Sequence, residues 1–317
     1  MNIEHGIPSA IEAVAKFQFA DYVEDNPTLL SLYHKAKRNQ WDAHMDIDWT
    51  YELNEDNPLA MPDGTIAIYG SSTWDKMSEK NRADLRNHVQ GWNISQILHG
   101  EQGALFCASR IAQSEPDMVI KYCNAVQVMD EARHIEVYSR LMSKMKNSYP
   151  ISGALYKLLE QIMGESRHDF ASLGMQILIE GLALTFFKNV QAYSNDPFVK
   201  NMQALVLRDE ARHFATGQVA LSGFYPQLME HERREREEFV VEACHTLREH
   251  LFGEDIWTPM GIPRSECREL IRASQINQSM QRSVFRHLVP AVSGIGLMGR
   301  EATRFFDNIG VLSYAAA

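Results

Sequence analysis

The sequence DEARH at residues 130–134 recurs unchanged at residues 209–213, 79 residues later. Another glutamate stands 30 residues before each motif glutamate, Glu101 in the first case and Glu180 in the second. A pattern of two glutamates and a histidine at fixed spacing therefore occurs twice. One repeated pentapeptide can arise by chance, but two matched distant carboxylates favour an internal repeat.

Residues that favour turns and helix starts lie midway between the paired glutamates. Ser-Glu-Pro-Asp occupies 114–117, and Ser-Asn-Asp-Pro occupies 194–197. A helix of about 14 residues on either side of such a turn is roughly 21 Å long. Each glutamate pair is thus expected at one height of an antiparallel helical hairpin. Two such hairpins pack together as a four-helix bundle.

The repeated motif also aligns its polar side chains. Positions i and i+3 share a helix face, so Glu131 points with His134. The same spacing joins Glu210 and His213. Packing the hairpins would bury four carboxylates and two imidazoles, which is very unfavourable without compensation. Two divalent cations would balance the four negative charges. Carboxylate and imidazole donors suit iron or manganese, with zinc as an alternative. The predicted ligands are Glu101, Glu131, His134, Glu180, Glu210 and His213.

The segment around Glu180 resembles a membrane span in length and composition. Glu180 is the only charged residue between Phe170 and Phe187. A carboxylate at the centre of a lone transmembrane helix is unfavourable. A helix that is apolar on all sides also occurs at the centre of a soluble protein. We therefore expect a buried core helix, no membrane partner, and a partner for the buried carboxylate of Glu180.

Length, composition and cysteine spacing predict a globular protein of the cytoplasm. The chain has 317 residues, of which 45% are hydrophobic and 23% charged, so it can bury a sizeable core. Its net charge of −10 argues against a nucleic-acid partner. The four cysteines lack the spacing of a zinc site or a disulfide framework. Residues 1–8 show no signal-peptide pattern.

Helical periodicity dominates the chain and predicts an all-α fold. We expect one all-helical domain over residues 1–317: a ferritin-like four-helix bundle at 82–225, an N-terminal cover at 1–81 and C-terminal helices at 226–317. The predicted helices are 28–46, 82–113, 117–147, 151–165, 168–194, 196–225, 227–252 and 264–306. The last helix is expected to break near Pro290. Residues 64–69 alternate like a strand, and the connection 54–76 is compatible with either a small hairpin or a lid.

The duplicated constellation resembles the ferritin-like di-iron carboxylate superfamily. Its Asp-Glu-x-Arg-His form is most similar to the oxygenase branch, which includes catalytic subunits of bacterial multicomponent monooxygenases and related aryl-CoA oxygenases and N-oxygenases. The resemblance covers residues 82–225 and is specific for the site rather than the substrate. It implies that Glu101, Glu131 and His134 hold one iron. Glu180, Glu210 and His213 would hold the other, with some carboxylates bridging and a Mn/Fe pair as an alternative.

The same motifs suggest residues that support the ligands. A metal-bound histidine usually donates its other ring N–H to a carboxylate. Asp130 and Asp209 are therefore expected to contact the two histidines, across the bundle. Arg133 and Arg212 would neutralise these aspartates, although ordinary surface ion pairs are the alternative. Related proteins extend the Asp–His link to a tryptophan for electron transfer, a role open to Trp41 or Trp49 alongside simple core packing.

Small and apolar side chains follow Glu101 and Glu180 by one and two helical turns. They predict a dry pocket for dioxygen and an organic substrate, with ordinary helix packing as the alternative. The predicted pocket residues are Ala104, Leu105, Ala108, Ala183, Leu184 and Phe187.

Three further positions bear on the reaction type. Tyr138 shares a helix face with Glu131 and has a spacing similar to that of the radical tyrosine of ribonucleotide reductase small subunits. Packing or hydrogen bonding is its default role. Thr185 is one residue too far from Glu180 to match the active-site threonine of multicomponent monooxygenases, so it receives no catalytic role. The N-oxygenase branch can carry an extra metal-binding histidine where this chain has Val206, which argues against that branch.

The sequence therefore predicts a dinuclear non-haem iron oxygenase. It would activate dioxygen to hydroxylate, epoxidise or N-oxygenate a small organic substrate, with the substrate and the type of oxidation left open. No flavin, nicotinamide or iron–sulfur motif is present, so a separate ferredoxin or reductase must supply electrons. A homodimer is expected from the resemblance. The alternatives are a radical-generating oxidase like a ribonucleotide reductase small subunit, and a non-catalytic iron-binding or storage protein.

Overall fold

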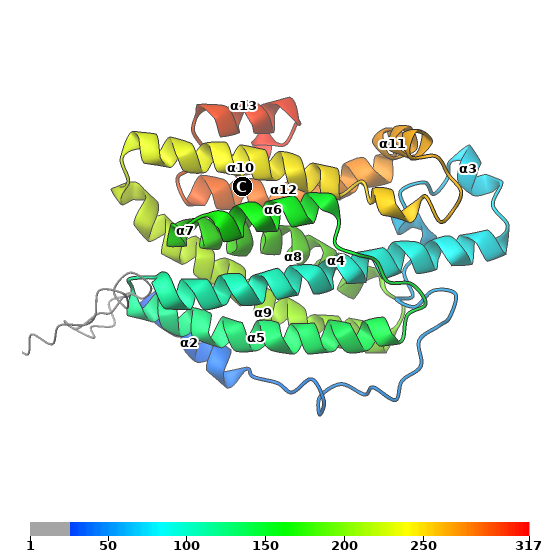
Figure 1. Ribbon diagram of the computed structural model, residues 1–317, viewed down its shortest axis with the longest axis horizontal. Coiled ribbons are helices and arrows are strands. Elements are labelled where there is room, and N and C mark those ends of the chain that lie inside the picture. Colours follow the sequence, from blue (N-terminus) through cyan, green and yellow to red (C-terminus); the bar gives the residue numbers. More distant parts are fainter. Residues whose placement is uncertain (1–25, 317) are drawn as a thin grey trace, which may run out of the picture.

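The computed structural model describes residues 26–316, and within this range the chain forms helices, turns and loops but no strand (Figure 1). The first 25 residues of the predicted N-terminal cover and the last residue lie outside the described residues. The α-helices are α2 (Pro27–Arg38), α3 (Ser72–Asp75), α4 (Glu79–Ser114), α5 (Met118–Ser143), α6 (Gly153–Gly164), α7 (His168–Ala171), α8 (Glu180–Tyr193), α9 (Pro197–Phe224), α10 (Glu230–His250), α11 (Arg264–Ala273), α12 (Gln275–Gly294) and α13 (Arg300–Asn308).

Two antiparallel hairpins form the centre of the fold, and each turns at its predicted midpoint. Helix α5 begins after Asp117, whose side chain accepts hydrogen bonds from two backbone N–H groups of the first turn. Helix α9 begins after Asp196 in the same way, and Pro197 occupies its first position. Helix α4 packs along α5, and α8 packs along α9. The all-α, ferritin-like bundle predicted from the repeat is confirmed.

The third bundle helix, which precedes α9, contains an irregular segment. A π-helix spans Ser172–Ile179, between α7 and α8, and ends at Glu180. Such segments widen the helix locally and are frequent at functional sites. The whole stretch His168–Tyr193 is long and apolar enough to cross a membrane, yet 83% of its most apolar window is buried inside the protein. The protein interior thus accounts for its apolar character.

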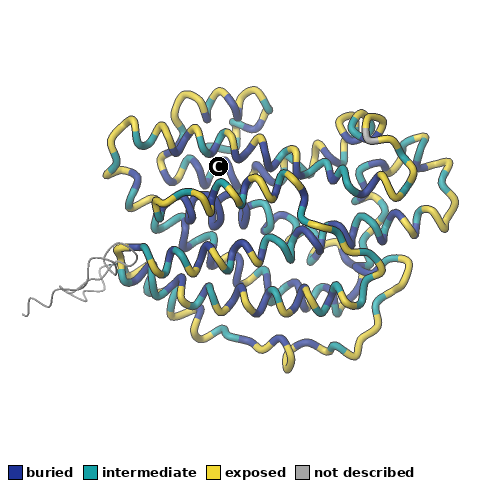
Figure 2. The backbone as a smooth tube through the Cα atoms, in the orientation of Figure 1, coloured by how far each residue is buried: buried dark blue, intermediate teal, exposed yellow. Residues whose placement is uncertain are grey.

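The C-terminal helices cover one side of the bundle. Helix α10 packs on α6, α13 and the π-helix, while α12 packs on α8. In Figure 1 these helices form a second layer beside the central hairpins. Figure 2 shows that buried residues lie where helices face one another, and exposed residues lie on the outer faces. The C-terminal layer thus covers the side of the bundle that contains α8, one of the helices that carry the glutamates.

The predicted break near Pro290 is wrong. Pro290 lies inside α12, which continues to Gly294, and the chain is interrupted instead at Ser274 and over 295–299. An internal proline costs about 3 kcal/mol. Val289, Ala291 and Val292 beside it are fully buried, and burying such side chains offsets that cost.

The segment between α2 and α4 is mostly irregular. The predicted helix 28–46 ends at Arg38, and residues 64–69 form a short 3-10 helix at Asp63–Thr65 followed by turns rather than a strand. The connection before α6 passes very close to α4, since a Cβ at Gly91 would lie 2.4 Å from the carbonyl oxygen of Asn147. A glycine is required for this approach.

Candidate metal centre

The six predicted ligands converge at the centre of the bundle, and all six are buried. Nδ1 of His134 lies 2.9 Å from Oε1 of Glu210 and 3.4 Å from Oε2 of Glu101. Nδ1 of His213 lies 3.1 Å from Oε1 of Glu131. Both imidazoles thus turn the same ring nitrogen toward the carboxylates, although the two hairpins supply them separately.

The donor atoms form two overlapping groups, each with atoms within 4.8 Å of one another. One group contains Glu101, His134 and Glu210, and the other contains Glu180 and His213. Glu131 belongs to both. The sequence-based division placed Glu210 in the second group, whereas its carboxylate here lies closer to His134 than to His213. A carboxylate shared by two groups is the arrangement expected of a bridging ligand.

Several of these donor atoms lack any hydrogen-bond partner among the described residues. They are Nδ1 of His134, Nδ1 of His213, Oε2 of Glu131, Oε2 of Glu180 and Oε1 of Glu210. Buried polar atoms in proteins are nearly always hydrogen-bonded. Oxygen and nitrogen donors left free around one point are what two divalent transition-metal ions require. The residues present therefore fit a dinuclear metal cofactor.

The electrostatics of the cluster lead to the same conclusion. Burial, and then repulsion from Glu210, raises the pKa of Glu101 and of Glu180 well above the usual carboxyl value. Burial alone would lower the pKa of His134 and of His213, but the surrounding carboxylates outweigh it and raise both. The cluster thus holds more negative charge than its own imidazoles neutralise, and bound cations would supply the balance.

The aspartates of the two motifs pair across the bundle. Nε2 of His134 lies 3.4 Å from Oδ2 of Asp209. Nε2 of His213 lies 3.2 Å from Oδ2 of Asp130. Each aspartate therefore reaches the histidine of the other motif. This contact fixes the orientation of each ring so that Nδ1 faces the carboxylates.

The motif arginines hold both aspartates. Arg133 donates to Asp130 and, at 2.9 Å, to Asp209. Arg212 donates to Asp209 at 2.5 Å and to Asp130 at 3.3 Å. Both guanidinium groups are buried. Their position excludes the alternative of ordinary surface ion pairs.

The loop after α2 completes this network. Nε1 of Trp41 donates to Oδ2 of Asp209 at 2.6 Å, and its indole ring stacks on His134 at 6.4 Å between centroids. The guanidinium of Arg133 lies over the same indole. Trp49 instead donates to the backbone carbonyl of Ala43. Of the two tryptophans considered from the sequence, only Trp41 contacts an aspartate of the cluster.

A chain of buried amides on the opposite side escaped the sequence analysis. Nε2 of Gln127 donates to Glu131 at 2.9 Å and to Glu180 at 2.8 Å. Gln176, from the π-helix, donates in turn to Gln127 and to Asn124. Gln127 precedes Glu131 by four residues and so shares its helix face, a signal that could have identified it. Gln176 had no such signal, because the π-helix sets its direction.

The three remaining candidates are buried. The hydroxyl of Tyr138 is hydrogen-bonded with Gln203, and its ring stacks on Phe187. Burial raises the pKa of Tyr138 well above its usual value, so it stays protonated. Thr185 lines a cavity, described next, and its Oγ1 has no hydrogen-bond partner among the described residues. Val206 packs in an apolar cluster with Tyr138.

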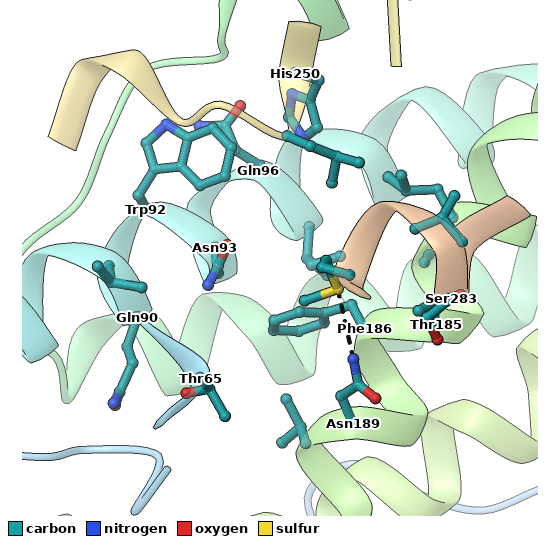
Figure 3. Close-up of a pocket in the computed structure, with 18 of the residues that line it drawn as sticks. Thr65, Gln90, Trp92, Asn93, Gln96, Thr185, Phe186, Asn189, His250 and Ser283 are labelled. Atoms are coloured by element: carbon teal, nitrogen blue, oxygen red, sulfur yellow. Dashed lines mark hydrogen bonds between the residues drawn. The ribbon is translucent and has the colours of Figure 1, made fainter. Parts of the chain in front are cut away.

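A cavity of about 670 Å³ opens beside the cluster (Figure 3). Its wall includes Glu101, Glu180 and Glu210. Two predicted pocket residues, Ala104 and Ala183, line it. Four others do not, and their prediction is wrong: Leu105, Ala108, Leu184 and Phe187.

The error has a geometric cause. Along α4 the cavity extends from Ala104 past Glu101 toward the start of that helix, and it does not reach the later residues Leu105 and Ala108. Along α8 it follows the face that carries Phe186 and Asn189. Phe187 faces the other way, against Tyr138. The spacing from a glutamate predicts a shared face but not the direction in which the space extends.

Solved structures with the same fold include R2-like ligand-binding oxidases. One with an aerobically reconstituted metal cofactor after photoconversion has 15% identity and a TM-score of 0.50, covering 86% of this chain and 94% of its own. A single-residue variant with an anaerobically reconstituted Mn/Fe cofactor has 15% identity and a TM-score of 0.52 over the same shares. No curated protein sequence matches the chain.

A match to a family model shows which branch of the di-iron oxygenases the chain belongs to. The profile described as "P-aminobenzoate N-oxygenase AurF" matches residues 24–296, which is most of the chain. The argument from Val206 against the N-oxygenase branch is therefore wrong. The cofactor is dinuclear, as the buried carboxylates and imidazoles require. The chain belongs to the AurF family of ferritin-like di-iron oxygenases.

Proposed function

We propose that this oxygenase transfers an oxygen atom to the nitrogen of an aromatic amine. The observation that carries the proposal is the cavity whose wall includes Glu101, Glu180 and Glu210, since a substrate bound there lies beside the cluster. Family membership supports nitrogen as the atom oxidised. The balanced first step is ArNH2 + O2 + 2 H+ + 2 e− giving ArNHOH + H2O, with the electrons from an external donor.

Each part of the chain has a distinct task in this reaction. Two iron ions held by the six clustered side chains would supply dioxygen activation. Asp130 and Asp209 hold the imidazoles in one orientation, and Arg133 and Arg212 hold the aspartates. The largely apolar cavity wall excludes water and keeps the amine beside the carboxylates. A dry site strengthens every electrostatic contact made there.

The electron donor is proposed to be a ferredoxin or a reductase that docks near Trp41. The chain from Trp41 through Asp209 to His134 joins the loop after α2 to the cluster. Trp41 lies in the cover that packs outside the bundle, whereas the other side of the cluster is occupied by buried amides.

The domain organisation, compartment and oligomeric state are also proposals. We propose that the chain is one domain, with the bundle at 82–225 flanked by its cover and C-terminal helices, and that it works in the cytoplasm as a homodimer. The four cysteines are buried and free, as expected in a reducing compartment. Light scattering should give twice the chain mass of 36.2 kDa.

Reconstitution with iron tests the proposed reaction. Protein loaded anaerobically with two iron ions per chain should consume dioxygen with a reductant and convert methyl 4-aminobenzoate to its hydroxylamine, detected by mass spectrometry. Glu131→Ala should abolish both metal binding and product. Glu136→Ala, which removes an exposed carboxylate from the same helix, should change neither. No dioxygen consumption at full iron occupancy would disprove the proposal.

A further inference from the structure

The cavity beside the metal centre is large and mostly apolar. Its volume of about 670 Å³ is in the range of sites that bind drug-sized organic molecules. It runs from the carboxylates between α4 and α8 to α12 and the segment 59–66. Trp92, Phe186 and Met280 are among its larger side chains. A single-ring compound would leave much of this space unfilled, so a larger apolar molecule fits better.

No positively charged side chain lines the cavity among the described residues. Its wall contains no lysine and no arginine. The only histidine is His250, which is buried, and burial lowers the pKa of His250 to about 4. At neutral pH this imidazole is therefore uncharged. Its Nδ1 is also engaged, 2.8 Å from Oγ of Ser152.

The polar groups of the wall away from the cluster are amides and hydroxyls. Asn93 and Asn189 supply amides, while Thr65 and Ser283 supply hydroxyls (Figure 3). Such groups orient a ligand through neutral hydrogen bonds. They do not repay the desolvation of an ionised carboxylate, which costs several kcal/mol or more when it is buried without a cation.

We propose that this site selects uncharged, predominantly apolar aromatic amines larger than one ring and discriminates against aromatic amines that carry a free carboxylate. An aromatic amine is itself uncharged at neutral pH, so its nitrogen can reach the cluster without the free-energy cost of burying a charge. The proposal rests on the proposed function for the amine, and on the cavity wall alone for the charge. This selectivity would distinguish the chain from an enzyme that acts on p-aminobenzoate, the substrate for which the family is named.

Binding of a matched pair of ligands tests the charge selection. 4-Aminobenzoate and its methyl ester differ little in shape but differ in charge. Calorimetry with the iron(II)-loaded protein, kept anaerobic, should show the ester binding at least ten times more tightly. A larger ester, such as the phenyl ester, should bind more tightly again. Equal or tighter binding of the free acid would overturn the proposal.

Placing a cation in the wall should reverse the preference. Asn93 lies on α4 two turns before Glu101 and reaches into the cavity, half-buried (Figure 3). Asn93→Lys should bind the acid more tightly than the ester, whereas Asn93→Met, of similar length and no charge, should keep the ester preference. Ser279→Lys, from α12, provides a second cation at a separate point of the wall if the first variant does not fold.

The two proposals fail differently. If the ester binds preferentially but iron, dioxygen and reductant yield no N-oxygenated product, the charge selection stands and the proposed reaction is wrong. If the acid binds as well as the ester and is N-oxygenated, the reaction stands and the charge selection is wrong. If both lysine variants fold, judged by circular dichroism and iron content, and neither gains affinity for the acid, the charge selection is also wrong.

Discussion

At the scale of single residues, Trp41 is the point where the N-terminal segment contacts the chemistry. Its indole N–H holds Asp209, and Asp209 in turn faces His134. The three groups form one continuous line of contacts from the loop after α2 to the cluster. Loss of such a partner of a metal ligand typically lowers metal affinity or activity by about 10- to 100-fold.

Trp41→Phe tests this line of contacts. Phenylalanine keeps an aromatic ring beside Arg133 but loses the N–H that binds Asp209, so reduction of the oxidised centre by the external donor should slow roughly tenfold or more. Stopped-flow absorbance at a fixed iron content measures the rate.

Trp49→Phe is the matched control, because the N–H of Trp49 binds only the carbonyl of Ala43. It should reduce at the normal rate. If both variants reduce equally fast, Trp41 has a packing role and no part in electron transfer.

The residue scale also shows which site features a sequence can reveal. The convergence of the six polar side chains follows from helix periodicity and two turns, and the cross-bundle aspartates follow from the needs of a metal-bound histidine. Glu131 belongs to both donor groups because of the conformation of its side chain, which helix spacing does not determine. The course of the cavity depends on helices α10 and α12, whose docking no local pattern encodes.

At the scale of elements, an ion pair joins the end of one bundle helix to the start of another. Nδ1 of His168, at the start of α7, lies 2.8 Å from Oε2 of Glu115, at the end of α4. Burial alone would lower the pKa of His168, but the Glu115 carboxylate outweighs it and the net pKa is raised. The folded state therefore holds this proton more tightly than the unfolded chain.

His168→Gln should reveal the resulting pH dependence of stability. Because the folded pKa is raised, the ion pair contributes fully below the unfolded value of about 6.5 and is lost as pH rises through the folded value. The substitution should cost roughly 0.5–1 kcal/mol at pH 5.5 and little beyond the change of side chain at pH 9. Urea unfolding at both pH values measures this.

An exposed histidine provides the comparison. His231→Gln, on α10, should leave the free energy of unfolding unchanged at both pH values. A cost for His168→Gln that is the same at pH 5.5 and pH 9 would contradict the ion-pair argument.

The elements also differ in how far the sequence determines them. The long helices of the two hairpins and the turns between them are local properties and were predicted within a few residues. Helix α12 passes through Pro290 because burial of its neighbours outweighs a local penalty. The chain after Arg38 leaves the predicted helix where Gln40 and Trp41 turn toward the aspartates, a tertiary interaction.

At the scale of the whole molecule, the cost of burying the cluster couples metal binding to stability. The metal-free protein carries buried donor atoms without hydrogen-bond partners, and bound metal would satisfy them. A ligand present at about 100 times its dissociation constant adds about 2.7 kcal/mol to the free energy of unfolding. Anaerobic iron(II) or manganese(II) should therefore raise the melting temperature by about 5 °C.

The control for this shift removes the shared ligand. Glu131→Gln should melt at the same temperature with and without metal, while Glu136→Gln should respond like the unmodified protein. Differential scanning calorimetry measures both. If the unmodified protein binds two metals per chain, counted by elemental analysis, without any rise in melting temperature, the cluster does not hold them.

The exchange of aspartates between the two motifs has a consequence for the origin of the fold. Asp130 contacts His213, and Asp209 contacts His134. The aspartate of each motif therefore meets the histidine of the other motif. This reciprocity is the signature of an isologous, twofold interface. A single helical hairpin bearing one DEARH motif would be self-complementary: two identical copies would supply every ligand and every aspartate. The present chain thus has the internal symmetry of a fused dimer, in which neither half can complete a metal centre alone.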